Sequence, residues 1–205
     1  MRRLLKPLVF LVLLLPLTWL IYAALTENLG ANPVENLLHE LGGWSLRMML
    51  LTLLMTPLRR LSGWSWPIKI RRMLGLFAFF YVCLHLFVYT GLDLGFDWPY
   101  LTEDILERPY ITIGFLAWLL LIPLAVTSNR KMIRKLGKRW KSLHRLVYLI
   151  MTLGLIHFVW LIKKDLREPL IYCAIFLVLM ALRAPLQWFS RTKKTSVGGH
   201  SYRSE

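Results

Sequence analysis

Acidic residues are scarce in this chain of 205 residues. It has 11 Asp and Glu against 26 Lys and Arg, which gives a formal net charge of +15 at pH 7. In a soluble protein such an excess is typical of nucleic-acid binding, whereas in a membrane protein it is typical of basic cytoplasmic loops. The positions of the charges along the chain distinguish the two classes.

Cysteine is scarce as well, and a glycine-rich nucleotide-binding motif is absent. Cys83 and Cys173 both lie in apolar runs, so the chain has neither a disulfide framework nor the spacing of a thiolate metal site. We expect both to be small buried hydrophobic residues. If a redox reaction here used electrons from NAD(P)H, another protein would have to bind the nicotinamide.

Long hydrophobic runs, by contrast, are abundant. The chain is 57% hydrophobic with a mean hydropathy of +0.52, which is typical of a polytopic membrane protein. Most runs approach the roughly 20 residues that cross a bilayer. We predict an all-α, six-transmembrane-helix bundle. The predicted spans are Pro7–Leu25, Gly43–Leu58, Met73–Leu92, Tyr110–Thr127, Leu143–Ile162 and Pro169–Trp188.

The lengths of the first two spans are informative. The first is too long for a signal peptide, and no small-residue cleavage site precedes Glu27, so we expect an uncleaved helix. The second is the shortest, and we expect Arg47, near its outer end, to reach the lipid headgroups.

The charges fall on alternate connecting segments. Residues 1–6, 59–72, 128–145 and 183–205 hold 21 of the 26 basic residues and a single acid, Glu205. Residues 26–42, 93–109 and 163–168 hold the other 10 acids. This is the positive-inside pattern. It predicts cytoplasmic termini, a multi-pass protein in contact with membrane lipids, and no nucleic-acid partner.

Two histidines interrupt otherwise apolar spans. His85 lies 12 residues, or about 18 Å, from the inner end of the third span, and His157 lies 14 residues, or about 21 Å, from that of the fifth. Both spans run outward, so the two imidazoles are expected at one depth in the outer half of the membrane. Each could simply bond a neighbouring helix. The matched depth favours a shared ligand, and haem iron best fits two facing imidazoles in a helical bundle.

A third histidine, His144, lies 13 residues before His157 at the cytoplasmic rim. The axial rise between His144 and His157, about 20 Å, suits a second, inner haem. The rotation of a regular helix over 13 residues, however, puts His144 about 140° from the face of His157. Arg71 and Arg72 occupy the level where an opposing histidine would be needed. They and their basic neighbours could bind haem propionates or a flavin phosphate, or simply contact lipid headgroups.

The remaining histidines carry no such prediction. His39 lies in an outer segment and is expected to be solvated or interfacial, and His200 lies in a polar tail. We therefore predict one membrane domain over residues 1–188 and a disordered cytoplasmic tail over 189–205.

Seven short strings, in order and spacing, resemble the MsrQ family of haem-binding membrane subunits and the wider ferric-reductase-like transmembrane domain. They are LGANPVE, TPLRR, RRMLGL, LHL around His85, RPYITIG, LGKRWKSLHRLVYL around His144, and IH at His157. The resemblance covers the chain up to about Trp188.

This resemblance implies a cytochrome-b-like electron carrier of the bacterial inner membrane. His85, His144 and His157 match the family's haem histidines, which implies one haem b and leaves a second open. Electrons would come from the quinone pool or a cytosolic flavin reductase. They would pass to a periplasmic molybdopterin methionine-sulfoxide reductase that repairs oxidised proteins. The family is also associated with FMN, for which the chain shows no motif.

Other functions remain open from the sequence. The same haem could serve a self-contained ferric or quinone reductase. A transporter or scaffold without a redox cofactor is disfavoured, since the spans contain no acid to form a polar pathway. The outer acids Glu103, Asp104 and Glu107 could dock a partner with a basic patch, or could reflect only the topological charge bias.

Overall fold

The computed structural model describes residues 4–162 and 165–183, and within these ranges the chain is helical almost throughout, with no strand. Its helices are α1 (Leu5–Leu25), α2 (Pro33–Ser62), α3 (Trp66–Val88), the π-helical turn η1 (Tyr89–Asp93), α4 (Trp98–Glu107), α5 (Pro109–Val126), α6 (Arg130–Leu136), α7 (Lys138–Leu143), α8 (Leu146–Leu161) and α9 (Arg167–Arg183). The predicted all-α class is confirmed.

Five helical segments are long and apolar enough to cross a membrane: α1, α2, α3 with η1, α5, and α7 with α8. The sixth predicted span, Pro169–Trp188, coincides with α9 over its first part, and its last five residues lie outside the described ranges. The chain is therefore a multi-pass membrane protein, and the count of six spans stays a prediction.

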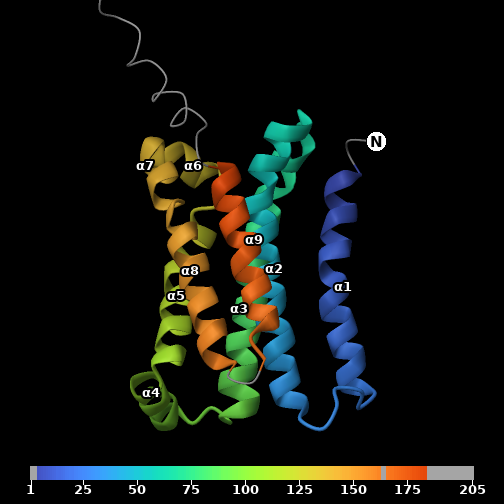
Figure 1. Cartoon of the computed structure of the whole chain (residues 1–205), viewed down its shortest axis with the longest axis vertical. Coiled ribbons are helices and arrows are strands. Elements are labelled where there is room, and N and C mark those ends of the chain that lie inside the picture. The colour runs from blue at the N-terminus through green and yellow to red at the C-terminus, as the bar shows by residue number, and fades with distance from the viewer. Residues whose placement is uncertain (1–3, 163–164, 184–205) are drawn as a thin grey trace, which may run out of the picture.

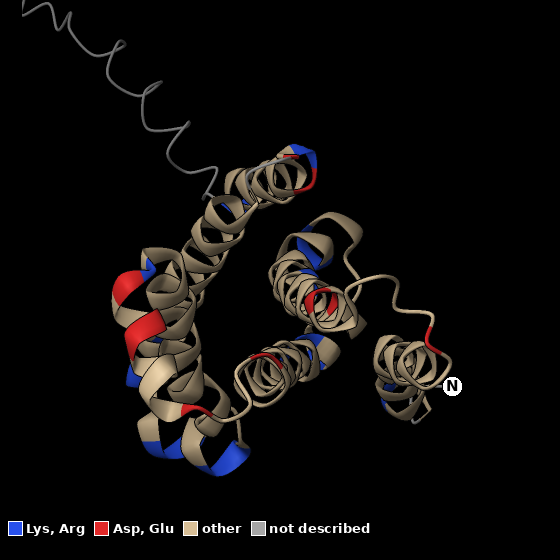
Figure 2. Cartoon of the chain, turned by 90° about the horizontal axis from the view of Figure 1, so that it is seen from below, with Lys and Arg blue, Asp and Glu red and all other residues tan. Residues whose placement is uncertain are grey.

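The helices form an upright bundle (Figure 1). α2 packs along α3, and α5 packs along α8, while α9 lies against α2 and α8. Seen from the end where α4 lies, α1 stands apart from the other helices, and most of the ribbon carries no charge (Figure 2). α1 is tied to the bundle by the Tyr81 hydroxyl, which donates to the Leu13 carbonyl at 2.7 Å.

The second span is the longest, and the prediction that it is the shortest was wrong. α2 has 30 residues: Pro33 occupies its first turn, and Gly63, with φ of +71°, ends it. Proline favours a helix start and a left-handed glycine favours a stop. Hydropathy identified only the apolar middle, because the outer turns of α2 carry polar residues. His39, expected in a connecting segment, consequently lies on α2.

Arg47 binds protein partners that the sequence did not predict, and that it also reaches the lipid headgroups stays a prediction. Its Nε donates to the Tyr172 hydroxyl at 2.7 Å, and its guanidinium lies 3.6 Å from the carboxylates of both Glu40 and Glu168. Arg47 therefore connects α2 to α9. Partners on a neighbouring helix lower the cost of placing a cation near the bilayer.

The basic segment before α8 is also more ordered than a loop. Residues 130–143 form the short helices α6 and α7, which meet at Gly137 with φ of +51°. The Asn129 side chain caps α6 by accepting from the Met132 amide at 2.8 Å. His144 and Arg145 lie between α7 and α8, so the unbroken helix assumed for the rotation between His144 and His157 is interrupted there.

Candidate functional site

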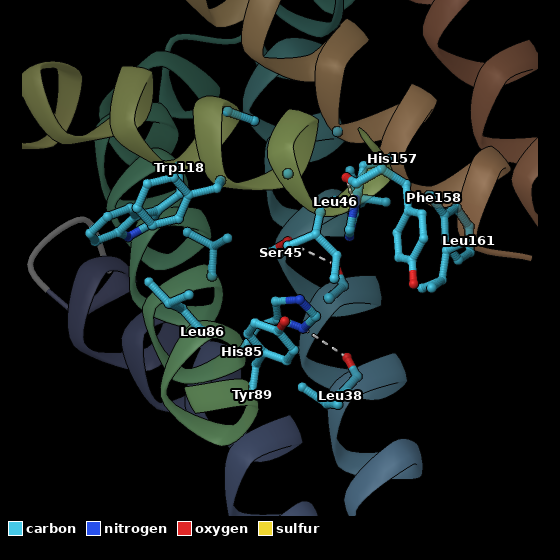
Figure 3. A pocket seen from close by; sticks show the side chains of 18 of the residues that line it. Leu38, Ser45, Leu46, His85, Leu86, Tyr89, Trp118, His157, Phe158 and Leu161 are labelled. Carbon is cyan, nitrogen blue, oxygen red and sulfur yellow. Dashed lines mark hydrogen bonds between the residues drawn. The ribbon is translucent and has the colours of Figure 1, made fainter. Parts of the chain in front are cut away.

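A cavity of about 340 Å³ lies inside the bundle, between the α2–α3 pair and the α5–α8 pair. Aliphatic and aromatic side chains form most of its wall, including Leu46, Leu86, Trp118 and Phe158 (Figure 3). A mainly apolar pocket with a few converging polar groups is the usual form of a cofactor site. Two of those polar groups are the predicted histidines.

His85 on α3 and His157 on α8 point into this cavity from opposite sides (Figure 3). Their ring centres are 6.4 Å apart and the rings are nearly perpendicular, at 84°. The structure thus brings together the two side chains whose matched depth suggested proximity.

Each imidazole is held by a backbone carbonyl. Nδ1 of His85 lies 3.0 Å from the Leu38 oxygen, and Nδ1 of His157 lies 2.7 Å from the Tyr110 oxygen. A carbonyl can only accept, so the proton of each neutral ring is on Nδ1 and the lone pair is on Nε2. This is the arrangement of metal-binding histidines, whose second nitrogen is usually fixed by a hydrogen bond.

His144 lies outside the cavity. Its Nε2 is 3.1 Å from the Thr127 hydroxyl, and its ring stacks on Trp140 with centres 4.0 Å apart. Trp140 in turn donates to the Thr127 carbonyl at 3.0 Å. The sequence did not predict that Trp140 and Thr127 hold His144.

The predicted inner arginines also lie away from the cavity. Arg71 is half-buried and Arg72 is exposed, both on the first turns of α3, and neither lines the cavity of His85 and His157. At the depth of His144, the facing turn of α3 carries Arg71 and Arg72. Within the described ranges, therefore, no histidine lies opposite His144.

A polar network at the outer end of the cavity was not predicted. Asp104 is 5% exposed; it accepts from the Tyr89 hydroxyl at 2.5 Å and pairs with Arg108 at 3.0 Å. The Tyr110 hydroxyl and the Asp104 carboxylate raise the pKa of Arg108, which therefore stays charged. Tyr89 and Arg108 line the cavity.

This network corrects one prediction. Asp104 was grouped with Glu103 and Glu107 as an acid that could dock a partner, but its carboxylate is turned inward and occupied. Glu103 and Glu107 are exposed. The Asp104–Arg108 pair has the i, i+4 spacing of a helical ion pair, which a sequence pattern can find, whereas Tyr89 enters the network from a π-helical turn that no pattern predicts.

Residues 41–155 match the family model described as ferric reductase like transmembrane component. A protein-methionine-sulfoxide reductase heme-binding subunit MsrQ of Herminiimonas arsenicoxydans is 46% identical over 201 residues, 97% of this chain and 92% of the relative. The chain belongs to the MsrQ family. The MsrQ subunit of Rhodospirillum rubrum is 53% identical over 176 residues, 85% of each chain. No solved structure matches the chain.

The members of the MsrQ family just described are named heme-binding subunits, and the cavity fits that group. An imidazole nitrogen lies about 2 Å from a bound metal, so rings on either side of one iron have centres roughly 6 Å apart; here the distance is 6.4 Å. Within the described ranges no three His, Cys, Asp or Glu side chains cluster as ligands of a bare ion. Two axial imidazoles therefore suit a macrocycle that supplies the other ligands.

Proposed function

We propose that this chain is the haem b electron-transfer subunit of a periplasmic methionine-sulfoxide reductase system in the bacterial inner membrane, with His85 and His157 as the axial ligands. The observation that carries the proposal is the pair of imidazoles, with ring centres 6.4 Å apart. Each has Nδ1 on a carbonyl, and its Nε2 has no hydrogen-bond partner among the described residues. Membership of the MsrQ family supports it.

The chain's own residues do three things in this function. The two histidines bind, and their carbonyl partners orient them. The apolar wall excludes water and keeps the dielectric low, which influences the reduction potential of whatever is bound. Bound haem would supply reversible one-electron chemistry. Since His85 and His157 lie in the outer half of their helices, electrons would leave toward the periplasm.

The partners follow from the same proposal. The acceptor is a periplasmic molybdopterin enzyme that reduces methionine sulfoxide, and the donor is the quinone pool or a cytosolic flavin reductase. His144, Arg71 and Arg72 are proposed for an inner haem or for the phosphate of FMN. Their location at the inner ends of α3 and α8 supports an inner site separate from the cavity of His85 and His157.

The test is optical. The full chain is purified in detergent after expression with ample haem, and oxidised and dithionite-reduced spectra are recorded with pyridine haemochrome quantification. We expect b-type haem, and we expect His85→Ala and His157→Ala each to lose the haem of the cavity. His200→Ala, in the polar tail, is the matched control and keeps it; His144→Ala removes at most an inner haem.

Two results would contradict the proposal. A preparation without b-type haem would exclude the function, and full six-coordinate spectra in both His85→Ala and His157→Ala would exclude the ligand pair. A purified subunit that reduces ferric ions or a quinone rapidly without its partner would favour the alternative, a self-contained reductase.

A further inference from the structure

The same local geometry occurs twice in the bundle, 72 residues apart. In the first copy, His85 bonds the carbonyl of Leu38 and packs on Gly42. In the second, His157 bonds the carbonyl of Tyr110 and packs on Gly114. In both copies the glycine follows the carbonyl residue by four positions and the histidine follows it by 47.

The two copies lie in corresponding helices. Gly42 and His85 belong to the α2–α3 pair, and Gly114 and His157 belong to the α5–α8 pair. α3 and α8 both run from the end of the bundle where α6 and α7 lie to the end where α4 lies (Figure 1). The cavity separates the pairs, so each pair contributes one imidazole, held in the same way.

Glycine has a specific reason to be at these two positions. In a helix, the carbonyl of residue i accepts from the amide of residue i+4, so a side chain at i+4 stands beside that carbonyl. The carbonyl has a second lone pair, but another group reaches it only if the space is open. Glycine leaves that space open.

The distances show that the imidazoles occupy this space. A Cβ at Gly114 would lie 2.8 Å from Nδ1 and 2.9 Å from Cε1 of His157. A Cβ at Gly42 would lie 3.3 Å from Nδ1 and 3.4 Å from Cε1 of His85. The first contact is impossible without movement of the ring, whereas the second needs a shift of a few tenths of an ångström.

We propose that Gly42 and Gly114 are positioning residues for the haem ligands: each lets an imidazole reach a helical carbonyl, which fixes the proton on Nδ1 and aims Nε2 into the cavity. This rests on the proposed ligation by His85 and His157. A hydrogen bond from Nδ1–H makes an imidazole a stronger electron donor to its metal. Stronger donation stabilises the oxidised iron and lowers the reduction potential.

The experiment compares Gly114→Ala, Gly42→Ala and Gly75→Ala with the unmodified full chain in detergent. Gly75 is the matched control: it too is a glycine inside a helix, α3, but a Cβ there would meet only Thr52 among the described residues, at 3.7 Å. The readouts are the haem-to-protein ratio, the spin state in the oxidised spectrum, carbon monoxide binding by the reduced form, and the midpoint potential. Size-exclusion profiles report folding.

The expected effect on the haem is large for Gly114→Ala, small for Gly42→Ala and absent for Gly75→Ala. Gly114→Ala should lose six-coordinate haem and gain a high-spin, carbon monoxide-binding fraction, because His157 must leave its carbonyl. Gly42→Ala should keep six-coordinate haem, with a midpoint potential shifted upward. Gly75→Ala should match the unmodified chain in every readout. If Gly114→Ala does not fold, the midpoint potential of Gly42→Ala alone tests the positioning role.

Failure of this inference differs from failure of the proposed function. If the unmodified chain binds six-coordinate haem but Gly114→Ala and Gly42→Ala match Gly75→Ala, the positioning role is excluded and the ligation stands. If the unmodified chain binds no haem, or binds it without His85 and His157, the proposed ligation and this inference fail together.

Discussion

Asp104 illustrates how single residues hold the outer end of the cavity. Its carboxylate joins Tyr89, one turn after His85, to Arg108, which directly precedes α5. It thereby connects α4 to both helix pairs. A buried carboxylate that keeps two hydrogen-bonded partners is stabilising, whereas removing it leaves those partners unsatisfied.

At this scale we predict that Asp104→Ala destabilises the protein by about 1–3 kcal/mol, since the Tyr89 hydroxyl and the Arg108 guanidinium lose their acceptor. The measurement is the thermal unfolding midpoint in detergent. Glu103→Ala, the exposed neighbour on α4, is the control and should change the midpoint little. Equal midpoints for the two variants would show that the network contributes nothing to stability.

The histidines show which residue-scale features can be predicted. His85 and His157 could be paired because polar residues in apolar spans are conspicuous and depth follows from counting. Their carbonyl partners could not be identified, since a backbone acceptor leaves no mark in a sequence. Gly42 and Gly114 were visible, but only the helix packing shows what fills the space beside them.

At the scale of the elements, α2 and α9 are joined by an arginine at a proline break. Pro57 lies inside α2 and cannot donate to the carbonyl of Leu53, four residues earlier. Arg183 of α9 replaces that donor: its Nε lies 3.0 Å from the Leu53 oxygen, and its Nη1 donates to the Tyr148 hydroxyl at 2.7 Å. In lipid, an unpaired carbonyl would be costly.

We predict that Arg183→Ala destabilises the protein by about 1–3 kcal/mol. The loss should be smaller in a Pro57→Ala background, because an alanine at 57 restores the amide that the Leu53 carbonyl lacks. A double-mutant cycle measured by unfolding in detergent gives the coupling, expected at about 0.5–3 kcal/mol. Additive effects of the two substitutions would mean that Arg183 does not serve the proline break.

Element boundaries were predictable only where composition changes with structure. The apolar middle of α2 was found, but its polar outer turns were not. The short helices α6 and α7 were taken for a connecting segment because residues 128–145 hold eight basic residues and separate two apolar runs. The π-helical turn at Tyr89 has no sequence signature at all.

For the whole molecule, the charge pattern predicted the topology, and that prediction can be tested with three reporters. We expect Glu103→Cys to react with a membrane-impermeant maleimide added to intact spheroplasts, and Lys131→Cys to react only after permeabilisation. A fluorescent protein fused after Glu205 should fluoresce, as it does only in the cytoplasm. A cytoplasmic Lys131 with a periplasmic C-terminus would exclude the six-span arrangement.

The fold class could be predicted because hydropathy, charge bias and span length all reflect the bilayer itself. The twofold arrangement of the α2–α3 and α5–α8 pairs could not, because the corresponding segments share few residue identities beyond the glycine and the histidine. Their similarity is in the packing, which becomes visible only when Leu38, Gly42 and His85 are compared in space with Tyr110, Gly114 and His157.

The backbone acceptors at Leu38 and Tyr110 have a consequence for genetics. Any replacement at these two positions keeps a carbonyl, so an alanine scan of the bundle would report only the loss of the Leu38 and Tyr110 side chains and would overlook the backbone half of the apparatus that orients the imidazoles. Sensitivity of the imidazole orientation to substitution would instead appear four residues downstream, at the glycines. There an added methyl group crowds the approach of the imidazole to a backbone oxygen, which no substitution removes.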